Sequence, residues 1–137
     1  MAATAQLAST NLLKPPEFAK HWAQELCTSP ETLVQLRGGI NNRVFRCGSH
    51  KRYWIIKGYP THPDEQQSRM EAEVDFLRYA RVVASSRVPE LIAVDKDRHC
   101  AVMEYIFGNG YADGSSLNRE DIEAARIFFN DLNLNIE

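Results

Sequence analysis

Five short segments of β-strand composition surround one long helical segment, and this order constrains the fold more than any other feature. The strand segments are residues 32–36, 43–47, 52–59, 91–94 and 100–106. Residues 64–84 carry apolar side chains at helical spacing and predict the long helix. Its expected sheet-facing stripe comprises Met70, Val74, Leu77 and Arg81, with Glu73, Phe76 and Ala80 beside it. Short strands joined by hairpins and packed on one helix indicate an α+β protein, with a five-stranded antiparallel sheet.

A further helix is expected on each side of this unit. Pro15 and Pro16 open the first helix, because proline is tolerated in a first turn, and Phe18 and Trp22 recur at helical spacing. Asn118 is expected to cap the last helix. The apolar side of that helix comprises Ile122, Ala125, Phe128, Phe129 and Leu132. The chain then divides into an N-terminal extension (1–30), a central unit (31–108), and a loop with the last helix (109–137).

Charge and cysteine content exclude several classes of function. The 137 residues include 16 Lys and Arg against 18 Asp and Glu, so the net charge is −2. Nucleic-acid arms and polybasic membrane surfaces need a cationic excess, so neither partner is expected. No window approaches the ~20 apolar residues of a membrane span, and residues 1–13 lack the order of a signal peptide. Three scattered cysteines and four dispersed histidines lack the spacing of metal ligands. The three cysteines also do not form a disulfide framework, so a reducing compartment, the cytoplasm, is expected.

Two adjacent glycines, Gly38 and Gly39, lie between the first two strand segments. A hairpin tip without side chains lets backbone amides approach a phosphate closely. The alternative is a plain turn, which glycine pairs also form.

A lysine at the end of the apolar run 53–56 is the second candidate. Lys57 shares one strand face with Tyr53 and Ile55, and an ammonium there needs an anion. Glu73 borders the buried stripe of the long helix, so we expect the charged groups of Lys57 and Glu73 within salt-bridge reach. A rotated helix would bring in Glu71 instead. The alternatives are a lysine reaching out to solvent and a solvated glutamate.

The end of the fifth strand segment is the third candidate. Residues 104–108, from Glu104 to Gly108, run from a strand into a loop, and free backbone there can hydrogen-bond a purine. The alternative is a core strand that simply ends.

Taken in order, these features resemble the N-terminal lobe of the protein-kinase-like fold, in its aminoglycoside phosphotransferase and choline kinase branch. Residues 38–45, Gly-Gly-Ile-Asn-Asn-Arg-Val-Phe, are similar to the branch's phosphate loop, and residues 54–57 resemble the third strand with its lysine. Residues 69–78 resemble the helix with the glutamate partner, and residues 88–93 and 102–108 resemble the next strand and the hinge. The resemblance covers roughly residues 30–135.

The resemblance implies a site for ATP or GTP. The base would lie at the backbone of residues 104–106, from Glu104 to Ile106, beneath an apolar roof of Val44 and Ile55. Lys57 would contact the α- and β-phosphates, oriented by Glu73. The implied nucleotide-binding residues are Gly38, Gly39, Asn42, Val44, Ile55, Lys57, Glu73, Glu104 and Ile106.

One departure limits what the resemblance implies. Phosphoryl transfer needs a catalytic aspartate and magnesium ligands, which the family carries beyond the hinge. After Gly108 this chain has only Asp113, Asp121 and Asp131, and no histidine. We therefore assign no catalytic residue and no metal ligand. Magnesium is expected only in a complete two-lobe enzyme, and the chain is expected to be inactive alone, either as a piece of a larger enzyme or as a naturally short protein.

The expected partners are a nucleotide and either a C-terminal lobe or a second copy of the chain. The last helix of such a lobe packs on the larger lobe, so its apolar residues would lack cover here and favour a homo-oligomer. Two alternatives stay open: a non-enzymatic protein-interaction module, and an unrelated α+β fold with a small-ligand pocket.

Overall fold

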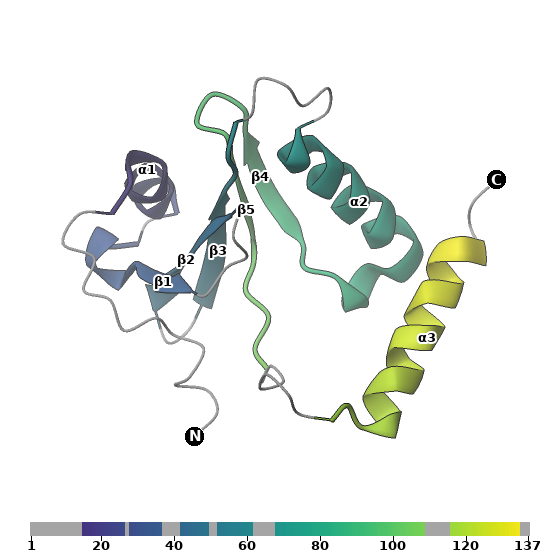
Figure 1. The fold of residues 1–137 in the computed structure, drawn as a ribbon. Helices are drawn as coiled ribbons and strands as arrows, with labels where there is room; N and C mark the ends of the chain where they lie inside the picture. The colour runs from purple at the N-terminus through teal and green to yellow at the C-terminus, as the bar shows by residue number, and fades with distance from the viewer. Residues whose placement is uncertain are drawn as a thin grey trace.

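The computed structural model describes residues 15–26, 28–36, 42–49, 52–61, 68–108 and 116–134. It shows the expected α+β architecture, a five-stranded antiparallel sheet with three α-helices (Figure 1). The strands lie in the order β1-β2-β3-β5-β4. In chain order the elements are α1 (Glu17–Glu25), a 3₁₀ turn (Pro30–Thr32), β1 (Val34–Leu36), β2 (Arg43–Ser49), β3 (Arg52–Gly58), α2 (Arg69–Ala84), a second 3₁₀ turn (Ser85–Arg87), β4 (Leu91–Asp95), β5 (Cys100–Glu104) and α3 (Arg119–Leu134).

The two faces of the sheet are covered by different helices, with α1 on one side and α2 on the other (Figure 1). Side chains alternate along β3, so Ile56 packs under α1 while Ile55 packs under α2. The α1 side is built from Ala19, Ala23, Leu33, Phe45, Cys47, Ile56 and Val102. The α2 side is built from Tyr59, Met70, Val74, Leu77, Ala80, Val88, Ala101, Met103 and Leu132. The sheet is therefore a shared middle layer with a separate apolar core on each face.

Several element boundaries differ from those expected. The helix expected from residue 64 begins at Arg69, because Ser68 is extended and its hydroxyl accepts a hydrogen bond from the Glu71 N–H at 3.0 Å. Asp64 itself lies outside the described residues. The first strand begins only at Val34, after a 3₁₀ turn, and the fifth ends at Glu104 rather than Ile106.

The second strand continues through residue 49, two residues beyond the expected segment 43–47. Gly48 allows this, because its φ of +127° suits glycine, and a Cβ there would lie 2.2 Å from the Arg52 carbonyl oxygen. The hairpin of β2 and β3 pairs Gly48 with Tyr53. Gly48 therefore allows β2 to stay paired with β3 up to the end of the hairpin.

The buried stripe of α2 is narrower than expected. Met70, Val74, Leu77 and Ala80 are buried, but Arg81 is exposed and its guanidinium donates to the Ser85 carbonyl. Phe76 was expected beside the stripe and is 44% exposed. It lies two residues from Val74, about 200° around the helix, and so on the solvent side.

The α3 helix is attached to α2 at its C-terminal end. Leu132 is buried, its carbonyl accepts from the Tyr79 hydroxyl, and Arg87 pairs with Asp131. The predicted cap is confirmed: Asn118 Oδ1 accepts from the Asp121 N–H at 2.8 Å. The exposed apolar side chains of α3 are Ile122, Ile127, Phe129 and Leu134. The expected apolar side of α3 therefore packs against the α2-side core only near Phe128 and Leu132.

No helix within the described part of the chain has the length and apolar character needed to cross a bilayer.

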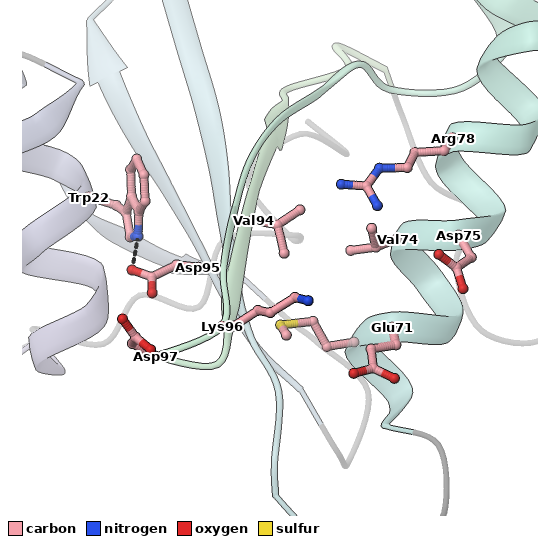
Figure 2. Close-up of a pocket in the computed structure, with 10 residues that line it drawn as sticks. Trp22, Glu71, Val74, Asp75, Arg78, Val94, Asp95, Lys96 and Asp97 are labelled. Atoms are coloured by element: carbon pink, nitrogen blue, oxygen red, sulfur yellow. Dashed lines mark hydrogen bonds between the residues drawn. The ribbon is translucent and has the colours of Figure 1, made fainter.

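A hydrogen bond ties α1 to the β4–β5 hairpin. The Trp22 indole Nε1 donates to Asp95 Oδ2 at 2.8 Å (dashed in Figure 2). Asp95 Oδ1 also accepts from the Arg98 N–H at 3.0 Å, and the Arg98 guanidinium lies 3.2 Å from Oδ2. Burial raises the pKa of Asp95, but the hydrogen bonds from Arg98 and Trp22 outweigh it and lower the pKa below its usual value. The charged form of Asp95 is therefore the one that holds α1.

Replacing Trp22 with phenylalanine is expected to lower the free energy of unfolding by about 1.5 kcal/mol at pH 7, the low end for a hydrogen bond to a charged group. Since the folded pKa of Asp95 is lowered, this stabilisation is present above the unfolded pKa of about 3.9 and is lost as the pH falls through the folded pKa. Urea unfolding at pH 7 and below pH 4 measures it. Trp54→Phe is the control, because Trp54 is half-buried and its indole has no such bond to any residue that the structure describes. An equal loss in both variants would contradict the assignment.

Candidate functional site

An ion pair bridges the end of β3 and the second turn of α2. Lys57 Nζ lies 2.8 Å from Glu73 Oε2 and donates to Oε1 at 2.9 Å. The side chains are 19% and 29% exposed, so the pair lies at the edge of the α2-side core. The predicted pairing of Lys57 with Glu73 is confirmed, and Glu71 is exposed on the helix rather than in its place.

A tyrosine holds the second carboxylate oxygen of this pair. The Tyr59 hydroxyl donates to Glu73 Oε2 at 2.5 Å, and the ring lies 5.4 Å from Lys57 Nζ. Burial raises the pKa of Tyr59, and its hydrogen bond to Glu73 and the charge of Glu73 raise it further, so the hydroxyl stays protonated. Sequence reasoning missed Tyr59. The period of two along the strand was the available signal, because Tyr59 lies two residues beyond Lys57.

This arrangement leaves donor capacity on the lysine. An ammonium has three N–H donors, and within the described residues Lys57 donates to Glu73 alone. Glu73 is in turn fixed by Tyr59. The pair therefore presents a positioned cation that can bind a further anion, such as a phosphate oxygen.

The apolar residues of the predicted roof lie next to this cation. Val44 is the register partner of Lys57 on the neighbouring strand, and Ile55 is two residues before Lys57, so all three share one sheet face. Val44 and Ile55 are half-buried. The structure thus brings together Val44, Ile55, Lys57 and Glu73.

The phosphate-loop residues are only partly described. Gly38 and Gly39 lie outside the described residues. Asn42 directly precedes β2, and its buried Oδ1 has no hydrogen-bond partner within the described chain. A buried amide oxygen without a partner is costly, so Asn42 Oδ1 can accept a hydrogen bond from a ligand that binds near Val44.

One backbone group of the third candidate segment already has a partner. The Glu104 N–H donates to the Glu90 carbonyl at 2.9 Å, and the Glu104 carboxylate accepts from the Glu90 N–H at 3.0 Å. The Glu104 N–H is therefore occupied and cannot bind a base. Residues 105–108 follow outside any strand, and Ile106 is 57% exposed, so the backbone available to a base lies there.

An arginine beside the roof was missed by sequence reasoning. Arg46 is the register partner of Ile55, and its guanidinium carbon lies 4.6 Å from the Tyr53 ring centre and 5.5 Å from that of Tyr105. Its Nε is buried and has no hydrogen-bond partner within the described chain. Stacking on two rings holds the guanidinium in place, and no acidic partner of Arg46 occurs among the described residues. Arg46 adds a second cation to the face that carries Lys57.

No set of three or more His, Cys, Asp or Glu side chains that could hold a metal ion occurs in the described ranges. A scan against protein-family models and a search of curated proteins found no match to this chain.

Proposed function

We propose that the chain is the nucleotide-binding N-terminal lobe of a small-molecule phosphotransferase, which transfers phosphate from ATP or GTP to a hydroxyl group. The observation that carries the proposal is the Lys57–Glu73 ion pair, which joins β3 to α2 and is held by Tyr59. A five-stranded antiparallel sheet with one helix on this face is the setting in which such a pair contacts nucleotide phosphates.

Each candidate residue has a role in this proposal. Lys57 contacts the α- and β-phosphates, and Glu73 and Tyr59 position it. Val44 and Ile55 cover the base, whose edge is bound by backbone groups at Ile106. Gly38, Gly39 and Asn42 contribute the phosphate loop. Magnesium would be held by aspartate and asparagine side chains of a second lobe.

A cytoplasmic location fits this proposal. Cys47 and Cys100 are free and buried, and burial raises the pKa of both thiols, that of Cys100 to about 12. Free thiols are typical of a reducing compartment.

Replacing Lys57 with alanine is expected to weaken nucleotide binding at least tenfold, because the ammonium contacts the phosphates directly. Fluorescence titration with N-methylanthraniloyl-ATP and the GTP analogue measures it. Lys96→Ala is the matched control, since Lys96 lies on the β4–β5 turn and outside this site. Circular dichroism verifies that Lys57→Ala is folded, and Glu73→Gln provides a second variant. Equal nucleotide affinity in wild type, Lys57→Ala and Glu73→Gln would overturn the proposal.

We further propose that the chain associates with a second lobe or a second copy through α3. Ile122 and Phe129 are 53% and 61% exposed, and monomers rarely expose contiguous apolar patches beyond a few hundred Å². The isolated chain is expected to sediment as a dimer or a larger oligomer, and Phe129→Ser to shift it toward monomer. A clean monomer at high micromolar concentration would show that α3 does not drive association.

The alternative function, a non-enzymatic interaction module, draws on exposed apolar residues outside α3. Ile106 and Phe107, which follow β5, are 57% and 70% exposed, as apolar protein-binding residues are. Under this alternative, Lys57→Ala leaves partner binding unchanged, whereas under the first proposal it weakens nucleotide binding.

A further inference from the structure

An arginine surrounded by aromatic rings lies on the sheet face that carries the Lys57–Glu73 pair. The Arg46 guanidinium carbon lies 4.6 Å from the Tyr53 ring centre and 5.5 Å from that of Tyr105. The two tyrosine rings lie 5.7 Å apart, and the Phe107 ring packs edge-on against them, at 5.8 and 4.8 Å. These four residues, Arg46, Tyr53, Tyr105 and Phe107, form what we call the arginine–aromatic cluster.

The cluster lies at the end of the apolar roof that is farther from the phosphate-binding lysine. Lys57, Ile55 and Tyr53 follow one another on one face of β3 at intervals of two residues, and each interval spans about 6.6 Å. On β2, Val44 pairs with Lys57, whereas Arg46 pairs with Ile55. The direction from Lys57 to Arg46 therefore leads away from the phosphates of a bound nucleotide and toward its base.

The cluster also contacts the backbone that the proposed function assigns to the base. Tyr105 directly follows β5 and precedes Ile106, in a segment that belongs to no strand. The contact between the Tyr105 and Tyr53 rings joins this segment to β3. Arg46 therefore lies between the roof and the base-binding backbone, which are the two surfaces that would enclose a base.

The guanidinium of Arg46 has unused hydrogen-bond donors. Its Nε is buried and has no hydrogen-bond partner within the described chain. None of the ion pairs between described residues includes Arg46. A guanidinium carries five N–H donors in a planar fork and no acceptor, and a buried donor without a partner is costly. Arg46 therefore favours a ligand that offers it adjacent acceptor atoms.

The two purine bases differ in what they offer to such a fork. Guanine carries two neighbouring acceptors, O6 and N7, which arginine binds with two parallel hydrogen bonds. Adenine carries the N7 acceptor beside the N6 amine, and this amine is a donor that opposes the donors of a guanidinium. The donor pattern of Arg46 thus matches guanine and conflicts with adenine.

From this geometry we infer that Arg46 makes the nucleotide site selective for guanine over adenine nucleotides, through paired hydrogen bonds to O6 and N7 of the base. This role rests on the proposed function, which assigns the base to the roof of Val44 and Ile55. It adds the choice between GTP and ATP, because Lys57 contacts phosphates that both nucleotides share.

The test is displacement of N-methylanthraniloyl-GTP from the full chain by unlabelled nucleotides. GTP is expected to compete at least tenfold more strongly than ATP, because the paired contact is available to guanine alone. ITP keeps both O6 and N7, so it should also compete more strongly than ATP. 7-Deaza-GTP lacks N7 and is expected to compete at least fivefold more weakly than GTP.

Arg46→Met keeps an unbranched apolar side chain against the rings and removes every N–H donor. It is expected to weaken GTP binding at least tenfold and to leave ATP binding unchanged or tighter, so the preference disappears. Arg52→Met is the matched control, because the Arg52 guanidinium carbon lies 5.2 Å from the Trp54 ring centre on the opposite face of the sheet. This control should leave both affinities unchanged, and circular dichroism verifies that both variants are folded.

The outcomes distinguish the role of Arg46 from the proposed function. Equal competition by GTP and ATP in the wild type, or equal weakening of both by Arg46→Met, would overturn the role of Arg46. The nucleotide site would still stand if Lys57→Ala weakened both nucleotides. A preference for GTP that survives Arg46→Met, or 7-deaza-GTP that competes as well as GTP, would also overturn the role. Failure of both GTP and ATP to bind would overturn it together with the proposed function.

Discussion

The purified 137-residue chain is expected to release no ADP from ATP in the presence of magnesium, even if it binds the nucleotide. Phosphoryl transfer needs an aspartate that accepts the proton of the attacking hydroxyl, and side chains that hold magnesium on the phosphates. After Gly108 the aspartates of the chain are Asp113, Asp121 and Asp131 alone, and no histidine follows. A coupled assay for ADP, with single-turnover sensitivity, measures the outcome.

The positions of these aspartates give the physical reason. Asp131 is paired with Arg87 beside the second 3₁₀ turn, and Asp121 lies in the first turn of α3, where its N–H is bonded to Asn118. Asp113 lies outside the described residues. Neither Asp121 nor Asp131 belongs to the elements β3 and α2 that carry the Lys57–Glu73 pair. Steady ADP release that disappears in Lys57→Ala would contradict the expectation, because it would require a complete catalytic site in this chain.

Replacing Phe45 with alanine is expected to lower the free energy of unfolding by about 3–5 kcal/mol, the usual cost of truncating a buried phenylalanine. Phe45 is fully buried between α1 and the sheet, and its ring lies 5.7 Å from that of Phe18 in an edge-to-face arrangement. The variant loses this aromatic contact and leaves a cavity that the α1 backbone can fill only in part. Urea unfolding followed by circular dichroism measures the loss.

Phe76→Ala is the matched control, since it removes the same side chain from a site on the solvent side of α2 that is 44% exposed. It is expected to change the free energy of unfolding by no more than about 0.5 kcal/mol. The comparison separates burial from side-chain type. Similar losses in both variants would contradict the difference in burial between Phe45 and Phe76, and a small loss for Phe45→Ala would contradict the placement of α1 on the sheet.

The sequence by itself determined the order of strands and helices along the chain, the α+β class, and one contact of the site. Alternation in residues 52–59 put Ile55 and Lys57 on one face, and the helical period put Glu73 beside the buried stripe. The strand period and the helix period describe the two sides of one interface, between β3 and α2. The ion pair between Lys57 and Glu73 could therefore be predicted from these two periods alone. The Asn118 cap followed in the same way, because a cap depends on neighbours within one helical turn.

The tertiary structure decided the contacts between elements that are distant in sequence. Arg46 stacks on Tyr53 and Tyr105 because the pairing of β2 with β3 and the exit from β5 bring three segments together. Phe76 is exposed, and α3 is buried only near Leu132. In both cases the exposure of the side chain depends on which neighbouring element packs on that side of the helix. An open cavity between α2 and β4 likewise exists only because β4 lies at the sheet edge beside α2. Local periodicity specifies which face of an element is apolar, whereas the partner of that face depends on the packing of the whole chain.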